Sequence, residues 1–408
     1  MSPEVSETSW PSPEDPGPVS LESRAPVLPL TASALPQPVE AASQALVGEP
    51  ERWWLIPLLI ALASRLWGSL LVTGFATSSW PLFRHPPAAG PTTVWDGGWY
   101  LEIARFGYHA VPIAGTTLGW YHDFSFWPAW PALFGAALRG VPLPADLIGG
   151  LLANGLTIAG LVLWSGVLIR HFGRSSALYA IALIAFAPPA FILSMSYSEP
   201  LFLLLSGLFF YLPARSRIRP LLSALAQATR LTGFAVGASA LAQVWRARGR
   251  DGRAWISLLL PGFVFAAWWI FIAVLTGNPL GFMLGSPSWL TTSGQVGGPI
   301  SFFHDYAGVG SLVPIGISAG FVLLISLGTI RLALERRWEL AIYAGAAILP
   351  SLALANWQSM PRHLLIAVPA AGALMAPISI RTRRLLLFLS IGAELVYAIF
   401  VLGVHFAP

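Results

Sequence analysis

Long apolar segments, separated by short polar loops, occupy most of this chain from about residue 53 onward. The first covers roughly 53–75, and a helix that crosses a bilayer needs about 20 predominantly apolar residues. The other apolar segments lie at roughly 146–169, 176–195, 200–214, 220–245, 254–276, 311–330, 338–356, 363–380 and 385–405. This pattern predicts an all-α fold, a polytopic transmembrane helical bundle with about 9–12 membrane segments.

The basic residues indicate how these segments are oriented. All of them are arginines, and most lie in the short loops, which the positive-inside rule assigns to the cytoplasm. The clusters are Arg170 with Arg174; Arg215, Arg217 and Arg219; Arg246, Arg248, Arg250 and Arg253; Arg331, Arg336 and Arg337; and Arg381, Arg383 and Arg384. With the N-terminus inside, this topology requires 220–245 to be a re-entrant hairpin of two short half-helices, with its tip near Arg230.

Two regions differ from the membrane segments. Residues 1–50 are rich in Pro, Ser, Glu and Ala, which predicts a disordered cytoplasmic tail because such a segment buries too little apolar area to fold. Residues 51–408 are then one membrane domain, with a large first outer loop over 76–145 and another outer loop over about 277–310. The first outer loop contains a Trp- and Pro-rich stretch, Phe124 to Leu138, which we expect at the membrane interface.

Composition narrows the classes of function. Charged residues make up 10% of the chain, against about 25% in typical soluble domains, and 55% of the residues are hydrophobic. The net charge of +5 comes from loop arginines that set the topology, so no nucleic-acid partner is expected. The absence of cysteine excludes disulfides, thiolate metal sites and a cysteine nucleophile. These values are typical of a multi-pass protein of the cell membrane, surrounded by lipid.

Acidic residues are scarce enough to be considered one by one. Seven of the 18 lie in the tail, and the eleven others are Glu51, Asp96, Glu102, Asp123, Asp146, Glu199, Asp251, Asp305, Glu335, Glu339 and Glu394. Asp96 has the most informative setting, because the segment Trp95-Asp96-Gly97-Gly98-Trp99-Tyr100 closely follows the first apolar segment. Asp96 is therefore the candidate catalytic carboxylate. The alternative is that it caps an interfacial helix, since Asp is a preferred N-cap residue.

The predicted topology places further polar groups on the outer face. They are Glu199, after Ser196-Tyr197-Ser198; Arg230 at the hairpin tip; and Arg362 with His363 in the turn before the 363–380 segment. Glu199 either begins a helix, where the helix dipole favours a carboxylate, or pairs with Arg230. His122 and Asp123 are adjacent, which is poor evidence for a metal site, and we expect them to make structural or substrate hydrogen bonds.

Five segments, in the same order, resemble motifs of the PIG-V-type mannosyltransferases, which are GT-C enzymes. Trp95 to Tyr108 is similar to W-D-x-x-x-[YF]-x-x-I-A-x-x-G-Y, and His122 to Pro131 is similar to F-F-P-x-[YF]-P. Tyr197 to Phe202 resembles Y-[ST]-E-x-x-F, Ala228 to Gly233 resembles A-x-R-x-x-G, and Pro361 to Leu365 resembles [PM]-R-[YF]-x-L. The chain departs from the pattern at Leu231, where proline is common, and at His363, where an aromatic residue is common.

The resemblance implies a GT-C-type fold and an inverting transfer of mannose from a polyprenyl-phosphate donor to a (glyco)lipid acceptor on the outer face of the membrane. Such a transfer needs a base for the acceptor hydroxyl, for which Asp96 is the candidate, and cations for the departing phosphate. Arg230 and Arg362 suit that phosphate, because a guanidinium matches its oxygens bidentately, and His363 could also donate to it. No cofactor and no metal are expected besides the lipid-linked donor. Weaker candidates for substrate binding are Trp95, Tyr100, His122, Asp123, Trp127, Tyr197 and Glu199.

A multi-pass transporter or lipid flippase is the alternative function. Such proteins often carry related halves or paired broken helices, and no internal repeat is evident here. Arg65 and Glu394 fall inside predicted spans, where ionisable residues usually pair or serve a function. We therefore expect these two residues to contact each other within the bundle.

Overall fold

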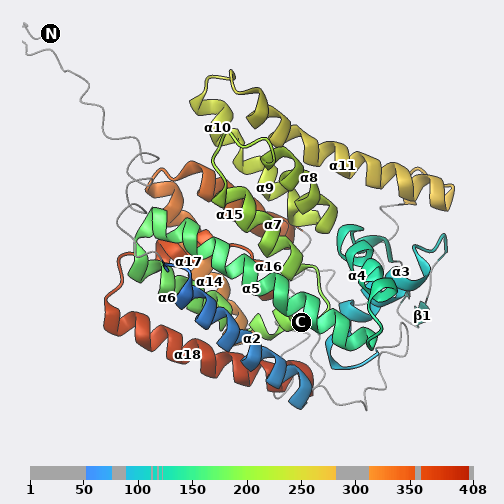
Figure 1. Cartoon of the computed structure of the whole chain (residues 1–408), viewed down its shortest axis with the longest axis horizontal. Helices are drawn as coiled ribbons and strands as arrows, with labels where there is room; N and C mark the ends of the chain where they lie inside the picture. Colours follow the sequence, from blue (N-terminus) through green and yellow to red (C-terminus); the bar gives the residue numbers. More distant parts are fainter. Residues whose placement is uncertain are drawn as a thin grey trace, which may run out of the picture. The chain divides into compact units, whose positions relative to one another are not determined.

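The computed structural model describes residues 52–75, 89–111, 114–116, 119–121, 123–281, 312–353 and 360–403. In this part of the chain, five helices are long and apolar enough to cross a membrane. They are α2 (Leu55–Phe75), α5 (Ala145–Phe172), α11 (Gly252–Thr276), α14 (Leu312–Leu334) and α18 (Ile380–Ala398), which continues into the π-helical turn η5 (Ile399–Gly403) (Figure 1). The predicted all-α, multi-pass membrane class is confirmed. The predicted tail and nearly all of the 277–310 loop lie outside the described residues.

Two of the predicted spans are broken rather than continuous. The 176–195 segment contains α6 (Arg174–Ala185), which has only 12 residues and ends before Pro188 and Pro189, because proline cannot continue a helix. A short 3-10 helix, η3 (Ala190–Ser194), follows, and α7 (Glu199–Tyr211) begins after it. The 363–380 segment is likewise divided into α16 (Met360–Leu364) and α17 (Val368–Met375). Both breaks lead to residues that the sequence singles out as site candidates.

The 220–245 segment is divided into short helices, as predicted, whereas its re-entry on one side of the membrane stays a prediction. It contains α8 (Arg219–Thr229), the 3-10 turn η4 (Leu231–Gly233), α9 (Phe234–Ser239) and α10 (Leu241–Arg246). Arg230 stands between α8 and η4 with an extended backbone, φ −168° and ψ 160°. The chain then folds back so closely that a Cβ at Gly233 would overlap the backbone of Ala226 and Gln227. The break therefore falls at the predicted tip.

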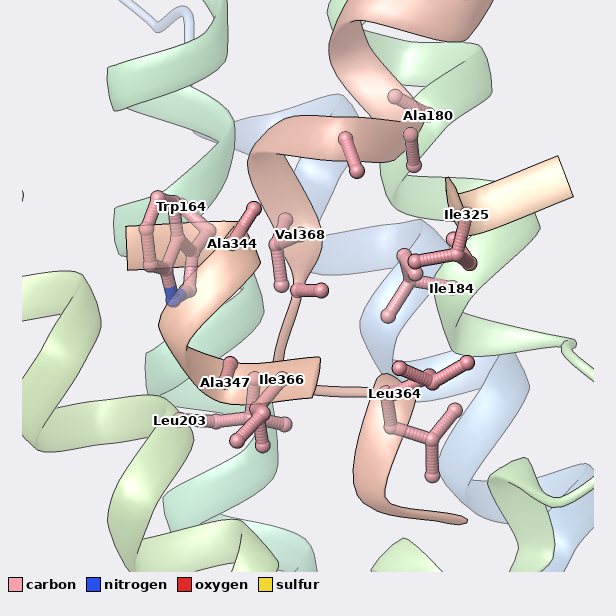
Figure 2. Packing of buried hydrophobic residues seen from close by; sticks show 14 of the residues in the cluster. Trp164, Ala180, Ile184, Leu203, Ile325, Ala344, Ala347, Leu364, Ile366 and Val368 are labelled. Atoms are coloured by element: carbon pink, nitrogen blue, oxygen red, sulfur yellow. The ribbon is translucent and has the colours of Figure 1, made fainter. Parts of the chain in front are cut away.

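The hydrophobic core lies where α5, α7, α14, α15 (Trp338–Ala353), α17 and α6 pack together. Figure 2 shows Trp164 of α5 beside Ala344 of α15, with Ile366 and Val368 of the 364–368 region close by. All four side chains are fully buried. Small residues bring the backbones together, since a Cβ at Gly160 of α5 would lie 2.9 Å from the backbone of Leu203 in α7. This core holds the starts of α7 and α16 in place.

The described part of the 76–145 segment, predicted as the first outer loop, is built of short elements. They are the 3-10 turn η1 (Pro91–Thr93), α3 (Asp96–Phe106), the strands β1 (Ala114–Thr116) and β2 (Gly119–Tyr121), the 3-10 turn η2 (Asp123–Ser125) and α4 (Ala129–Gly140). The two strands pair antiparallel, with Ala114 opposite Tyr121. Phe124 and Trp127 pack against Trp268 and Ile272 of α11, so this aromatic stretch anchors the loop to a long apolar helix.

Arg65 and Glu394 do not form the predicted direct contact. Arg65, buried in α2, donates instead to the carbonyls of Ala185 and Ala190 and to the hydroxyl of Ser194, each at 3.0 Å. The charges of Arg65 and Glu394 interact, but no hydrogen bond or ion pair joins these two described residues. The physical reason is that the backbone is broken after α6, and the Arg65 guanidinium lies within hydrogen-bond distance of carbonyls on both sides of the break.

Candidate functional site

Four ionisable side chains from four distant parts of the chain meet in one cluster. Oδ2 of Asp96 lies 2.6 Å from Nη1 of Arg362. Oε1 of Glu199 lies 2.9 Å from Nη1 of Arg230 and 3.4 Å from Nε of Arg362. The structure thus brings together the candidate base, both candidate phosphate ligands and one of the weaker candidates. We refer to Asp96, Glu199, Arg230 and Arg362 as the ion-pair cluster.

The backbone turns sharply just before Asp96. Trp95 has φ 51° and ψ −120°, a conformation that side-chain-bearing residues rarely adopt, and it stands at the N-cap position of α3. Asp96 is therefore the first residue of the helix, and no side chain caps the helix end. Asp96 is not the N-cap that the alternative interpretation required. Its carboxylate points to Arg362 instead, with a quarter of the side chain (25%) exposed.

Glu199 is the buried centre of the ion-pair cluster. It is the first residue of α7, where the helix dipole favours a carboxylate, and only 2% of it is exposed. Both proposed settings are therefore realised, because the same carboxylate begins the helix and pairs with Arg230. One buried carboxylate oxygen thus bridges two guanidinium groups.

Arg230 retains a donor that the protein does not use. Its Nε is buried and lacks a hydrogen-bond partner among the described residues, whereas Nε of Arg362 faces Oε1 of Glu199 at 3.4 Å. Buried polar groups are normally hydrogen-bonded, so unused donors of this kind mark a place where an acceptor can bind. The Arg362 guanidinium also lies over the ring of Tyr197, 5.2 Å from its centroid, and 3.5 Å from Nε2 of His363.

Tyr100 adds a neutral donor beside these charges. Burial raises the pKa of its phenol, and the nearby carboxylates of Glu199 and Asp96 raise it further. Tyr100 therefore keeps its proton at neutral pH and acts as a hydrogen-bond donor. Its ring packs edge-to-face on Phe126, with a centroid distance of 5.0 Å, and this contact joins α3 to the Trp-rich stretch.

A clamp centred on Thr92 holds the Asp96 and Glu199 segments together. The backbone N–H of Thr92 donates to Oδ1 of Asp146 at 2.7 Å, and its hydroxyl donates to the Asp146 carbonyl at 2.7 Å. The carbonyl of Thr92 accepts from the N–H of Ser196 at 2.8 Å, and the Ser196 carbonyl accepts from the indole of Trp130 at 3.2 Å. Sequence patterns did not identify this clamp. The one signal was Asp146 itself, a scarce acid at the start of an apolar segment.

The other weaker candidates lie in different settings. Trp95 and Tyr197 are buried in a common apolar cluster beside the ion-pair cluster. Trp127 is 2% exposed and packs against α11, so its faces are covered by protein. Asp123 bonds to His109 and not to the ion-pair cluster, and His122 lies outside the described residues.

The charges of the ion-pair cluster cancel, since two carboxylates face two guanidinium groups. An anionic ligand would therefore have to compete with a carboxylate for an arginine or use the unpaired Nε of Arg230. The described residues contain no group of three His, Asp or Glu side chains that could hold a metal ion. The chemistry that this arrangement can support is proton acceptance by a carboxylate next to cationic binding of an oxyanion.

Comparisons with known proteins identify a distant similarity. No family model matches the chain, and no curated protein matches it. Among solved structures, it is similar to the crystal structure of the Archaeoglobus fulgidus oligosaccharyltransferase in complex with zinc and sulfate. The two are 13% identical over 84% of this chain and 52% of that chain, with a TM-score of 0.43. This chain therefore spans about half the length of that protein.

Proposed function

We propose that this protein is a GT-C-type membrane glycosyltransferase that moves a mannosyl residue from a polyprenyl-phosphate donor to a (glyco)lipid acceptor on the outer face of the membrane. One observation carries the proposal. Asp96, Glu199, Arg230 and Arg362 each belong to a different motif of the mannosyltransferase resemblance, and all four share one ion-pair cluster. A shared site is what a common reaction requires of them.

The two arginines bind the phosphate of the sugar donor. The donor carries a phosphate that becomes the leaving group, and its negative charge grows as the bond to the sugar breaks. Arg230 has a buried Nε without a hydrogen-bond partner among the described residues, Arg362 lies beside it across Glu199, and guanidinium groups bind phosphate oxygens bidentately. His363 lies beside Arg362 and could contact the same phosphate or the sugar.

Asp96 is the base that activates the acceptor hydroxyl. The acceptor oxygen attacks the anomeric carbon, its proton passes to the Asp96 carboxylate, and the bond between the sugar and the phosphate oxygen breaks. Polyprenyl phosphate leaves with the electron pair, and the anomeric configuration is inverted because a single displacement occurs. Tyr100, a neutral donor near Asp96 and Glu199, suits a sugar hydroxyl or the phosphate.

The test is mannosyl transfer by the purified protein in proteoliposomes. Radiolabelled polyprenyl-phosphate-mannose is supplied with a crude lipid extract as acceptor, and the lipid products are separated after incubation. We expect labelled product with the wild-type protein and at least about 10²-fold less with Asp96→Asn at equal protein. Movement of the labelled lipid between leaflets without any transfer of mannose would favour the flippase alternative.

A further inference from the structure

A second polar pair lies in the first outer loop, apart from the ion-pair cluster. Oδ2 of Asp123 accepts from the backbone N–H of His109 at 3.0 Å and lies 3.1 Å from Nδ1 of the His109 ring. Two contacts to one carboxylate oxygen fix the imidazole. With Nδ1–H turned to the carboxylate, Nε2 is the nitrogen that remains for other partners.

The two members of this pair differ in exposure. None of the Asp123 side chain is exposed, whereas 33% of the His109 side chain is. Burial raises the pKa of the Asp123 carboxyl, and its hydrogen bonds with His109 oppose that effect. A buried acid that orients an accessible imidazole is the arrangement by which proteins aim a histidine at a ligand.

A second observation points to a ligand. Oδ1 of Asp123, the other carboxylate oxygen, is buried and has no hydrogen-bond partner among the described residues. If the pair served only to join the segment after α3 to η2, the two contacts of Oδ2 would be sufficient, and Oδ1 would need no partner. An unused buried acceptor lowers stability unless a hydroxyl or a water donates to it.

The pair is separated from the ion-pair cluster by one layer of aromatic residues. Tyr108, the neighbour of His109, donates its hydroxyl to the carbonyl of Phe126 at 2.7 Å. The Phe126 ring packs on Tyr100, whose phenol interacts with Asp96 and Glu199. A chain of direct contacts therefore links the pair to the ion-pair cluster.

We propose that His109 and Asp123 form the acceptor subsite and bind a hydroxyl of a sugar headgroup. This rests on the proposed function and narrows its acceptor to a glycolipid. A sugar fits because two of its hydroxyls can donate, one to Nε2 of His109 and one to Oδ1 of Asp123, which are both acceptors when Nδ1 carries the proton. An alkyl chain would leave both groups unsatisfied. His109 is the binding residue, and Asp123 is the positioning residue that aims it.

The experiment uses the full-length protein in proteoliposomes with two acceptor probes. Octyl α-mannopyranoside offers a sugar headgroup, and octanol offers a hydroxyl on the same alkyl chain. We expect transfer to the mannoside and little to octanol. Donor consumption is measured in the same samples, so absence of any donor turnover by the wild-type protein would reject the proposed function itself.

Three variants separate recognition from structure. His109→Asn keeps an N–H near the position of Nδ1 and so retains the bond to Asp123, but it removes Nε2. We expect it to raise the KM for octyl mannoside by about 10-fold or more, the loss of one good hydrogen bond, with the donor KM and the Tm unchanged. Asp123→Ala should raise the same KM, and Asp123→Asn should partly restore it. Glu102→Gln in α3 is the control and should behave as wild type.

Two results would overturn the acceptor subsite while leaving the proposed function intact. One is donor turnover by the wild-type protein with no preference for the mannoside over octanol. The other is a wild-type mannoside KM in His109→Asn, which would show that the pair only joins two parts of the loop.

Discussion

The carboxylate of Asp96 lies 2.6 Å from the guanidinium of Arg362, although the two residues are 266 positions apart in the chain. Under the proposed function, the base and a ligand of the leaving group are thus paired with each other before substrate arrives. A donor phosphate that binds Arg362 would weaken this pair and leave Asp96 available to the acceptor hydroxyl. The pairing therefore favours binding of the donor before the acceptor.

Asp96→Asn should abolish most transfer while the protein inserts and folds. The amide keeps the size of the side chain but cannot accept the proton, and general-base assistance is typically worth about 10²–10⁴-fold. Asp96→Glu should also be poor, because displacement of the carboxylate by about 1 Å can cost 10²-fold. Single-turnover transfer measures both effects. Near-native turnover in Asp96→Asn, with Glu102→Gln as the charge-matched control, would remove Asp96 as the base.

Arg362→Ala and Arg230→Ala should each weaken use of the donor. Loss of a charge-assisted hydrogen bond to phosphate is worth about 1.5–3 kcal/mol, which is on the order of 10- to 100-fold in donor KM. Lysine should rescue only in part, because it lacks the planar fork of the guanidinium. Exposed Arg105→Ala in α3 is the control. Unchanged donor kinetics in both alanine variants would place the phosphate elsewhere.

Glu199→Gln should destabilise the protein and impair donor use together. Removal of one partner from a buried ion pair costs on the order of 3–5 kcal/mol, because the opposite charges are left uncompensated. The double variant Glu199→Gln with Arg230→Gln should recover part of the Tm but not the activity, since it removes one charge of each sign. A thermal shift in detergent measures stability. A Tm for Glu199→Gln equal to that of wild type would contradict its central place in the cluster.

Thr92→Val tests the clamp between the Asp96 and Glu199 segments. Valine has nearly the same shape as threonine but loses the hydroxyl bonds to Asp146, worth about 0.5–1.5 kcal/mol, while the backbone bonds of residue 92 remain. We expect kcat to fall about 10-fold or more through misplacement, with a small change in Tm and none in donor KM. Thr92→Ser retains the hydroxyl and should restore kcat. Equal kcat values for the Val and Ser variants would show that the hydroxyl has no positioning role.

Topology can be tested with reporter fusions at residues 100 and 250. The first lies in α3 of the predicted outer loop, and the second follows α10 among the loop arginines. The positive-inside rule predicts opposite sides of the membrane for them. Both reporters on one side would invalidate the predicted outer-face site.

The apolar pattern predicted the regular parts of the fold well. It located α2, α5 and α11 to within a few residues, because a membrane-spanning helix can be recognised from the length and composition of its apolar segment. It also located the hairpin break near Arg230, since charge topology required the chain to turn there. The motifs identified all four members of the ion-pair cluster, although their distances could not be derived from spacing along the chain.

The irregular parts could not be predicted in the same way. The 176–195 segment is mostly apolar, so hydropathy did not reveal that α6 ends at Ala185 and that Arg65 donates to the buried carbonyls of Ala185 and Ala190. The expected contact of Arg65 with Glu394 was wrong because the Arg65 guanidinium bonds instead to the carbonyls of Ala185 and Ala190, whose positions hydropathy could not predict. The Thr92 clamp depends on hydrogen bonds between residues 54 positions apart, which leave no periodic signal.

The cancellation of charge in the ion-pair cluster also limits how this protein can evolve. A single change at Glu199, Arg230 or Arg362 removes one charge from this balance and leaves the cluster with a net buried charge, so a mutated lineage would pass through a less stable intermediate. Substitutions at these positions are therefore tolerated only when one acidic and one basic residue are replaced together. Homologous chains should consequently either keep the whole quartet or differ at paired positions, and a set of homologous sequences would reveal that coupling as covariation.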